Sequence, residues 1–169
     1  MGMISIRRGT AEDIGASAQL WIEAKGARLG KAQTDEALPG LLLSRLQEKG
    51  ALLFIVEAES ASVIGTATVF PARKPPNTGN IIKARAHISL VAVKPAYWGR
   101  GIGRQLMQRI LDELSRSDYQ AAQLWVETVN ERAVKLYLSL GFTPTSETKV
   151  NDEGELQQQY IHLLSKRRE

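Results

Sequence analysis

The sequence contains no cysteine and only two histidines, His87 and His162, in 169 residues. The lack of cysteine excludes disulfide bonds and thiolate nucleophiles. With so few imidazoles, a metal site is not expected either. No apolar stretch approaches the roughly 18 residues of a membrane span, and residues 1–8 hold no signal-peptide core. These absences predict a cytoplasmic protein that contacts no membrane and needs no metal.

The charge pattern is only mildly basic, with a formal net charge of +4. Part of this charge lies in the basic C-terminal tail, about residues 165–169, which we expect to be solvated and frayed. A nucleic-acid-binding domain usually shows a denser basic stripe or interleaved aromatic residues, so no nucleic-acid partner is expected. The length suits one domain with its own core, spanning residues 1–169.

One stretch, residues 88–114, reads as a strand, a glycine-rich turn and a helix. Its first residues, 88–93, form a short apolar run rich in β-branched side chains, and Pro95 ends it. The turn contains glycines spaced two apart: Gly99, Gly101 and Gly103. Apolar residues then recur four apart and predict the buried face of a helix: Ile102, Leu106, Ile110 and Leu114.

Such a turn before a helix favours an anion site. The first helical N–H groups lack intrahelical acceptors and carry partial positive charge, and glycines let a phosphate approach the main chain. Arg100 and Arg104 add full charges beside it. A dinucleotide fingerprint starting at Gly99 would need glycine at Arg104, and the Gly-Lys-Ser/Thr of a Walker motif is absent. A close-packed turn without a ligand stays an alternative.

Two segments together resemble the GNAT acetyltransferase superfamily. Residues 91–103, VAVKPAYWGRGIG, are similar to its acyl-CoA-binding signature, Gln/Arg-x-x-Gly-x-Gly/Ala. Trp98 stands where Gln or Arg is typical, whereas the glycines at 101 and 103 match. Residues 130–142, with Asn130, Tyr137 and a Gly-Phe pair, resemble the family's second signature, N-x-x-A-x-x-x-Y…GF.

The resemblance and the periodicity imply a mixed α/β fold. Its sheet is expected to be mostly antiparallel, with about six or seven strands and helices on both faces. We expect strands at 4–7, 51–58, 63–70, 87–93, 123–129, 142–150 and 156–164. We expect helices after Thr10, from residues 34–36 to Gly50, from Ile102, and after Asn130. Pro39 could break the second of these, so two short helices are an alternative there. Residues 71–80 are expected to form a loop, either a substrate lid or a plain connection.

The resemblance further implies transfer of an acetyl group from acetyl-CoA to an amine-bearing acceptor. Main-chain amides in the glycine turn would hold the diphosphate, and the backbone of residues 90–93 would pair with the pantetheine arm. A main-chain N–H near Leu90 or Val91 would polarise the thioester carbonyl. The expected cofactor-binding residues are Leu90, Val91, Ala92, Val93, Trp98, Gly99, Arg100, Gly101, Ile102, Gly103, Arg104 and Asn130.

Two residues are candidates for catalysis. Tyr137 stands at the family's general-acid position, although it also continues an apolar helix face and would suit a core aromatic. The attacking amine must lose a proton, since alkyl amines titrate near pH 10.4. His87 is a candidate base on the central strand, or a structural histidine, and Glu127 is a second candidate.

Other functions stay open at this point. The chain could be a non-catalytic acyl-CoA-binding module or an interaction domain. The acceptor itself is not readable, because such specificity lies in loops and helix ends. A polyamine, an amino acid, a drug-like amine, a peptide N-terminus and a lysine side chain all remain candidates. A homodimer is expected only on the basis of the family resemblance.

Overall fold

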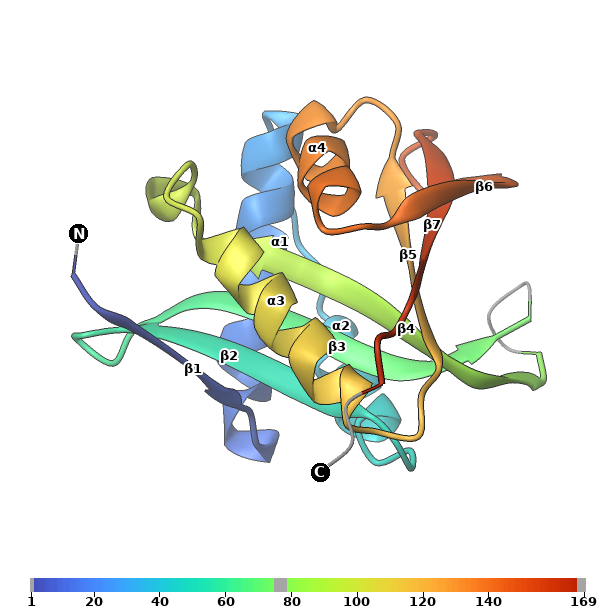
Figure 1. The fold of residues 1–169 in the computed structure, drawn as a ribbon. Helices are drawn as coiled ribbons and strands as arrows, with labels where there is room; N and C mark the ends of the chain where they lie inside the picture. Colours follow the sequence, from blue (N-terminus) through green and yellow to red (C-terminus); the bar gives the residue numbers. More distant parts are fainter. Residues whose placement is uncertain (1, 75–78, 167–169) are drawn as a thin grey trace. The chain divides into compact units, whose positions relative to one another are not determined.

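The computed structural model describes residues 2–74 and 79–166. Seven strands form one hydrogen-bonded sheet in the order β1-β2-β3-β4-β5-β7-β6 (Figure 1). The strands are β1 Ile4–Arg8, β2 Leu52–Ala58, β3 Val63–Arg73, β4 Ile81–Val93, β5 Ala121–Glu127, β6 Thr143–Val150 and β7 Leu156–Leu163. The β1·β2, β2·β3, β5·β7 and β6·β7 pairs are antiparallel, whereas β4·β5 is parallel. The mixed α/β fold with a mostly antiparallel sheet is therefore confirmed.

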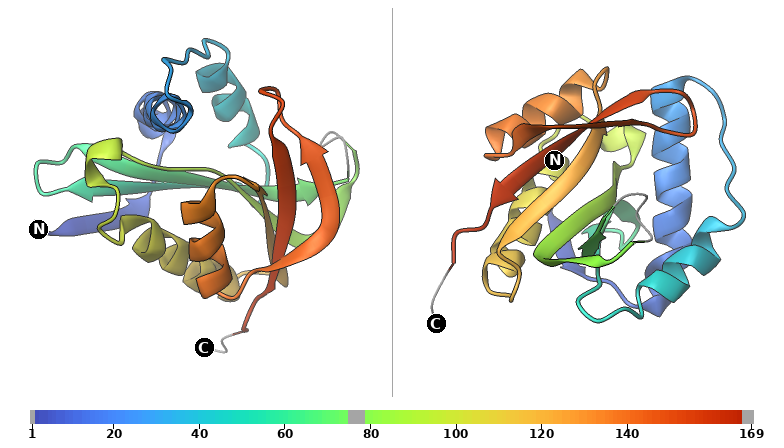
Figure 2. Two further views of the ribbon diagram at one scale, coloured as in Figure 1. Left: turned by 90° about the horizontal axis from the view of Figure 1, so that it is seen from above. Right: turned by 90° about the vertical axis from the view of Figure 1, so that its right-hand side faces the viewer.

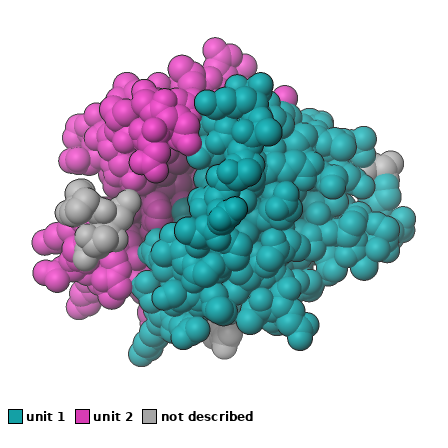
Figure 3. All heavy atoms as spheres, turned by 180° about the vertical axis from the view of Figure 1, so that it is seen from behind, with its two compact units in different colours: residues 1–70, 89–110 teal, residues 71–88, 111–169 magenta. Residues whose placement is uncertain are grey.

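The helices are α1 Ile14–Leu29, α2 Leu38–Arg45, α3 Ile102–Ser115 and α4 Glu131–Ser139, with short 3₁₀ turns η1 Ala11–Asp13 and η2 Pro95–Tyr97. No helix in the described part of the chain is both long and apolar enough to span a bilayer. The chain divides into two compact units (Figure 3). Residues 1–70 and 89–110 form the first unit, and residues 71–88 and 111–169 form the second.

The first unit buries both faces of its strands. On β2, Leu53 and Ile55 belong to a buried cluster with Ile14, Ala18, Leu38, Leu42 and Phe70 of α1, α2 and β3. Phe54 and Val56 are buried on the opposite face of the same strand. Figure 2 shows α1 and α2 on one side of these strands and the first turns of α3 on the other. The predicted apolar face of α3 is confirmed, since Ile102, Leu106, Ile110 and Leu114 are all buried.

Two boundaries in the first unit differ from the expectation. The helix predicted from residues 34–36 begins only at Leu38 and ends at Arg45. Pro39 does not break it but lies in its first turn, where a missing N–H leaves no intrahelical bond unmade. The β2·β3 register shifts between Val56 and Glu57, opposite Gly65, as at a β-bulge. A side chain there would meet Val56 at 2.8 Å.

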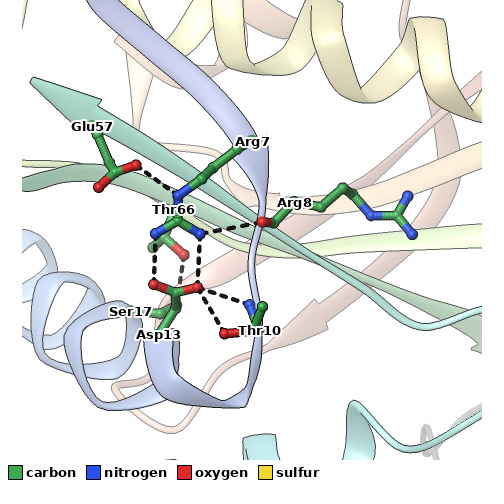
Figure 4. Close-up of polar contacts among 7 residues, drawn as sticks. All are labelled: Arg7, Arg8, Thr10, Asp13, Ser17, Glu57 and Thr66. Carbon is green, nitrogen blue, oxygen red and sulfur yellow. Dashed lines mark hydrogen bonds and ion pairs between the residues drawn. The ribbon is translucent and has the colours of Figure 1, made fainter. Parts of the chain in front are cut away.

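An ion-pair cluster ties β1 to the start of α1 (Figure 4). The Arg7 guanidinium donates two 2.8 Å bonds to the Asp13 carboxylate and a 2.6 Å bond to Glu57. Asp13 also accepts a bond from the Thr10 backbone, so Thr10 caps the 3₁₀ turn as expected of a helix start. The bond from Arg7, assisted by that from Thr10 and opposed by burial, lowers the pKa of Asp13 to about 2.

This pairing predicts acid sensitivity that depends on Asp13. A carboxylate whose pKa is depressed in the folded state stabilises the fold above its unfolded pKa near 4, and this contribution is lost as pH falls from about 4 to 2. Because the Arg7 side chain is 39% exposed and solvent screens the pair, we expect the ionised Asp13 to contribute only about 1 kcal/mol to the free energy of unfolding. In urea unfolding, Asp13→Asn should cost this amount at pH 6 and nothing near pH 2. Glu12→Gln, in the same turn but exposed, is the control; a cost independent of pH for Asp13→Asn would contradict the assignment.

The second unit is built around the β5, β7 and β6 strands, of which β6 and β7 form a hairpin (Figure 2). The strand predicted at 123–129 lies two residues earlier, at 121–127. Residues 151–154 form the turn of the hairpin, in which the Gly154 N–H donates to the Asn151 carbonyl at 3.0 Å. The loop predicted at 71–80 is wrong at its start, since β3 continues through a buried Pro71 to Arg73. Its central residues, 75–78, lie outside the described residues.

The C-terminal tail also departs from the expectation. Lys166 is not frayed, because its ammonium group donates to the carbonyls of Ser117, at 2.7 Å, and Tyr119. A cation at this place offsets the partial negative charge at the end of α3. Residues 167–169 of the predicted basic tail lie outside the described residues.

Candidate active site

The glycine turn leads directly into α3 in the first unit. Gly99 and Gly101 both have φ of 78°, a conformation that side chains with a Cβ rarely adopt, and neither Cβ position has a neighbour within 4 Å. The first α-helical bond runs from the Gln105 N–H to the Gly101 carbonyl at 3.1 Å. The amides of Ile102 and Gly103 therefore precede the first intrahelical bond. Main-chain donors at an open turn fit the diphosphate of a coenzyme.

The two arginines of the turn sit differently. The Arg100 side chain is exposed and lies 5.1 Å from the centre of the Tyr97 ring. Arg104 lies in the first turn of α3. Both arginines lie in the segment whose main-chain amides precede the first intrahelical bond. Their positive charges therefore add to the partial positive charge at the start of the helix.

The end of β4 contains a strained residue that the sequence did not indicate. Leu90 has φ of 52°, in the left-handed region, although its side chain packs against the apolar cluster of the first unit. On one side the strand is held by Thr68, whose hydroxyl donates to the Ser89 carbonyl at 2.9 Å, and by the 2.8 Å bond from Lys94 N–H to Ile64. Strain of about 1–3 kcal/mol persists only where the surroundings fix it, and it is common at ligand sites.

Trp98, which replaces the usual Gln or Arg, holds the last residue of β4. Its indole N–H donates to the Val93 carbonyl at 2.7 Å. The same turn contains the bond from Tyr97 N–H to the Lys94 carbonyl at 2.8 Å. The departure at Trp98 therefore still supplies a donor, and this donor fixes the end of the 90–93 segment.

Removing this donor should loosen the end of β4. We expect Trp98→Phe to lower the free energy of unfolding by about 1 kcal/mol and to weaken acetyl-CoA binding about fivefold. Urea unfolding and calorimetric titration measure the two effects. Trp21→Phe removes the same indole N–H from a ring of α1 that lies under Lys25 and packs against the apolar cluster, and it serves as control. Equal effects of both substitutions would count against the positioning role of Trp98.

Tyr137 is buried in α4 of the second unit, with 7% of its surface exposed. Its ring meets Phe142 edge-on at 5.9 Å. Burial, and to a smaller extent the charge of Glu127, raises the pKa of its hydroxyl, which therefore stays protonated at neutral pH. Asn130 caps the same helix, accepting a 3.3 Å bond from the Ala133 N–H. The predicted cap is confirmed.

His87 lies in a polar network of the second unit. Its Nδ1 is 3.3 Å from the amide nitrogen of Gln123, the residue opposite it in the last β4·β5 pair. The structure thus brings His87, Asn130 and Tyr137 into the second unit, and the residues from Leu90 to Arg104 into the first. Sequence reasoning missed Gln123, which is buried, and Trp125, which is half-buried; the alternating Gln-x-Trp-x-Glu pattern of β5 was the signal that they share one face.

Solved N-acetyltransferases share this fold. The ribosomal-protein-S18-alanine N-acetyltransferase from Escherichia coli superposes with a TM-score of 0.75 and 21% identity, covering 99% of this chain and 97% of that one. The yncA protein of Salmonella typhimurium, determined with its cofactor acetyl-CoA, gives a TM-score of 0.72 and 24% identity over 95% and 94% of the two chains. The architecture is therefore that of the N-acetyltransferases.

The sequence model of the acetyltransferase (GNAT) family matches residues 19–142, and the chain belongs to this family. The resemblance seen in the two signatures is confirmed. The L-methionine sulfoximine/L-methionine sulfone acetyltransferase of Salmonella typhimurium is 39% identical over 57 residues, which are 34% of this chain and 33% of that enzyme. The Escherichia coli S18-alanine enzyme is 36% identical over 62 residues, 37% of this chain and 42% of its own. The matched stretches thus span less than half of either relative.

Proposed function

We propose that the protein transfers the acetyl group of acetyl-CoA to a primary amine, by direct attack of the amine in a complex that holds both substrates. The observation that carries this proposal is the open glycine turn at the start of α3, within a chain of the GNAT family. Acetyl-CoA supplies an activated thioester. The protein has to hold that group, stabilise charge on its carbonyl oxygen and move two protons.

Binding falls to the first unit. Main-chain N–H groups of residues 99–104 hold the diphosphate, with Arg100 and Arg104 adding charge. The backbone of Leu90, Val91, Ala92 and Val93 pairs with the amide-rich pantetheine arm. The left-handed backbone at Leu90 changes the direction of its main-chain N–H. We assign this N–H, or that of Val91, the role of hydrogen-bonding the thioester oxygen.

Chemistry falls to residues of the second unit. The neutral amine forms an N–C bond to the acetyl carbon as the C–S bond breaks, and it loses one proton to a base. His87 or Glu127 takes this proton, directly or through water. The departing thiolate receives a proton from Tyr137, whose raised pKa keeps that proton in place until it is needed.

The proposal is tested by release of free coenzyme A in the presence of a panel of amines. Because the chain has no cysteine, a thiol reagent reports coenzyme A without background from the protein. The panel includes polyamines, amino acids, peptides and L-methionine sulfone, since one relative is named for L-methionine sulfone and another for the alanine of ribosomal protein bS18. Saturable acetyl-CoA binding without release on any amine would instead favour a non-catalytic acyl-CoA-binding module. No binding at all would favour an interaction domain. A homodimer stays a prediction, measured by sedimentation.

A further inference from the structure

In the second unit, one face of β5 and its neighbours is polar although it is largely covered. Gln123, Trp125 and Glu127 alternate along β5 and so point to the same side. Their partners in β7 are Ile161, Gln159 and Gln157, and Gln157 in turn lies opposite Lys149 of β6. Residues directly opposite each other in neighbouring strands share a face. We call Gln123, Trp125, Glu127, Gln157, Gln159 and Lys149 the polar face.

One part of the polar face is internally satisfied. Gln123 and Gln159 are 2% and 8% exposed, and the Gln159 amide donates to the Gln123 side-chain oxygen at 3.3 Å. The Thr145 hydroxyl donates to Gln159 at 2.8 Å, and the Gln123 amide meets His87 at 3.3 Å. Buried polar groups that find partners in this way are ordinary structural features.

Trp125 and Lys149 are different. The indole N–H of Trp125 is fully buried and has no hydrogen-bond partner among the residues that the structure describes. The Lys149 ammonium lies 4.5 Å from the centre of the same indole ring. Partial burial lowers the pKa of Lys149. The buried indole N–H thus lacks an acceptor in the described part of the chain, and a partly exposed cation lies beside it over the same ring.

The negative charge of the polar face lies one step along β5. Glu127 is two residues from Trp125, roughly 7 Å along the strand, and its carboxylate accepts bonds from Gln157 at 3.3 Å and Asn151 at 3.4 Å. Because the Lys149 side chain reaches across β7 to the Trp125 ring, positive and negative charge lie beside each other on β5. This is the charge pattern that a zwitterion complements.

We propose that the polar face binds an acceptor that carries a carboxylate beside its amine, with Trp125 and Lys149 receiving the carboxylate. The inference rests on the proposed acetyl transfer and names the class of acceptor. Two donors at one ring match the two oxygens of a carboxylate, whereas a polyamine would bring positive charge to Lys149. Glu127 faces the ammonium of the same molecule. A free amino acid or its derivative fits this pattern, and a polyamine does not.

Binding is tested directly by NMR of the tryptophan indole groups. The chain has three tryptophans, and Trp125→Phe assigns the signal of interest. Titration with L-alanine, L-methionine and L-methionine sulfone is expected to shift the Trp125 indole proton saturably, while the corresponding methyl esters leave it in place. Equal shifts with acids and esters, or no shift with any of these compounds, would overturn the proposal. This readout needs no turnover.

Kinetics supply the second test, on Lys149→Met and on Lys83→Met as an exposed control of the same unit. Wild type is expected to prefer the acid over its methyl ester at least tenfold in kcat/KM, although the ester has the more readily deprotonated amine. Lys149→Met should lose about tenfold on the acid, mainly through KM, and leave the ester within about twofold. Equal losses on both would refute the subsite. If no amine is acetylated, the proposed function fails and the indole titration still decides whether the subsite exists.

Discussion

Replacing Gly101 by glutamate is expected to abolish acetyl-CoA binding, with a rise in Kd of at least about 100-fold. The substitution forces a residue with a Cβ into φ of 78° and places a carboxylate among the amides at the start of α3. Nothing lies within 4 Å of the added Cβ, so the effect does not come from a clash within the protein. Repulsion between this carboxylate and the diphosphate is the main cause. Calorimetric titration with acetyl-CoA measures it.

Two further substitutions separate charge from backbone strain. Gly101→Ala carries the strain without the charge and should weaken binding by less than about tenfold. Gly30→Glu has the same charge and nearly the same backbone, since φ is 74° and its Cβ also meets nothing within 4 Å. It lies at the C-terminal cap of α1 and should leave the affinity unchanged. If Gly101→Glu bound acetyl-CoA as tightly as Gly30→Glu does, the assignment of this turn would be wrong.

The second large effect is expected from Tyr137→Phe, which should lower kcat about 100-fold and leave acetyl-CoA affinity unchanged. Only the hydroxyl is removed, and the edge-on contact of the ring with Phe142 is retained, so the fold should persist. Because burial raises the pKa of Tyr137, wild-type kcat should not fall through ionisation of this group below about pH 10. Steady-state rates over pH 6–10 check both statements.

The matched control is Tyr160→Phe, which removes a hydroxyl from another tyrosine of the same unit that is also 7% exposed. Its turnover should stay within about twofold of wild type. Should Tyr137→Phe turn over as fast as this control, the tyrosine would be a core aromatic, and the proton for the thiolate would have to come from another group.

The chain positions of the glycine turn, of α3 and of the Asn130 cap were predictable because each depends on local rules. Glycine is needed where φ is positive, apolar residues four apart make one helix face, and an asparagine side chain satisfies an orphan N–H. Element ends were less predictable. Pro71 reads as a loop residue, yet it is buried inside β3, because tertiary burial outweighs local preference at that position.

The conformation of Leu90 and the contacts of Trp125 were beyond the sequence. A left-handed leucine inside an apolar run has no local signal, since only the packing of its neighbours holds it there. The contact between Lys149 and Trp125 joins residues of β6 and β5 across β7, and it depends on a strand order that does not follow the chain. A contact of this kind can be recognised only when the strand order and the register of the strands are known.

The most direct test of the central claim is the response of backbone amide signals to acetyl-CoA. If main-chain N–H groups of residues 99–104 hold the diphosphate, their NMR signals should shift most strongly of all amides. Adenosine 3′,5′-bisphosphate keeps only one of the two phosphates of the diphosphate and lacks the pantetheine arm, so it should reproduce only part of this shift. Strong shifts elsewhere, with the amides of Gly99, Gly101 and Ile102 unchanged at saturation, would contradict the account.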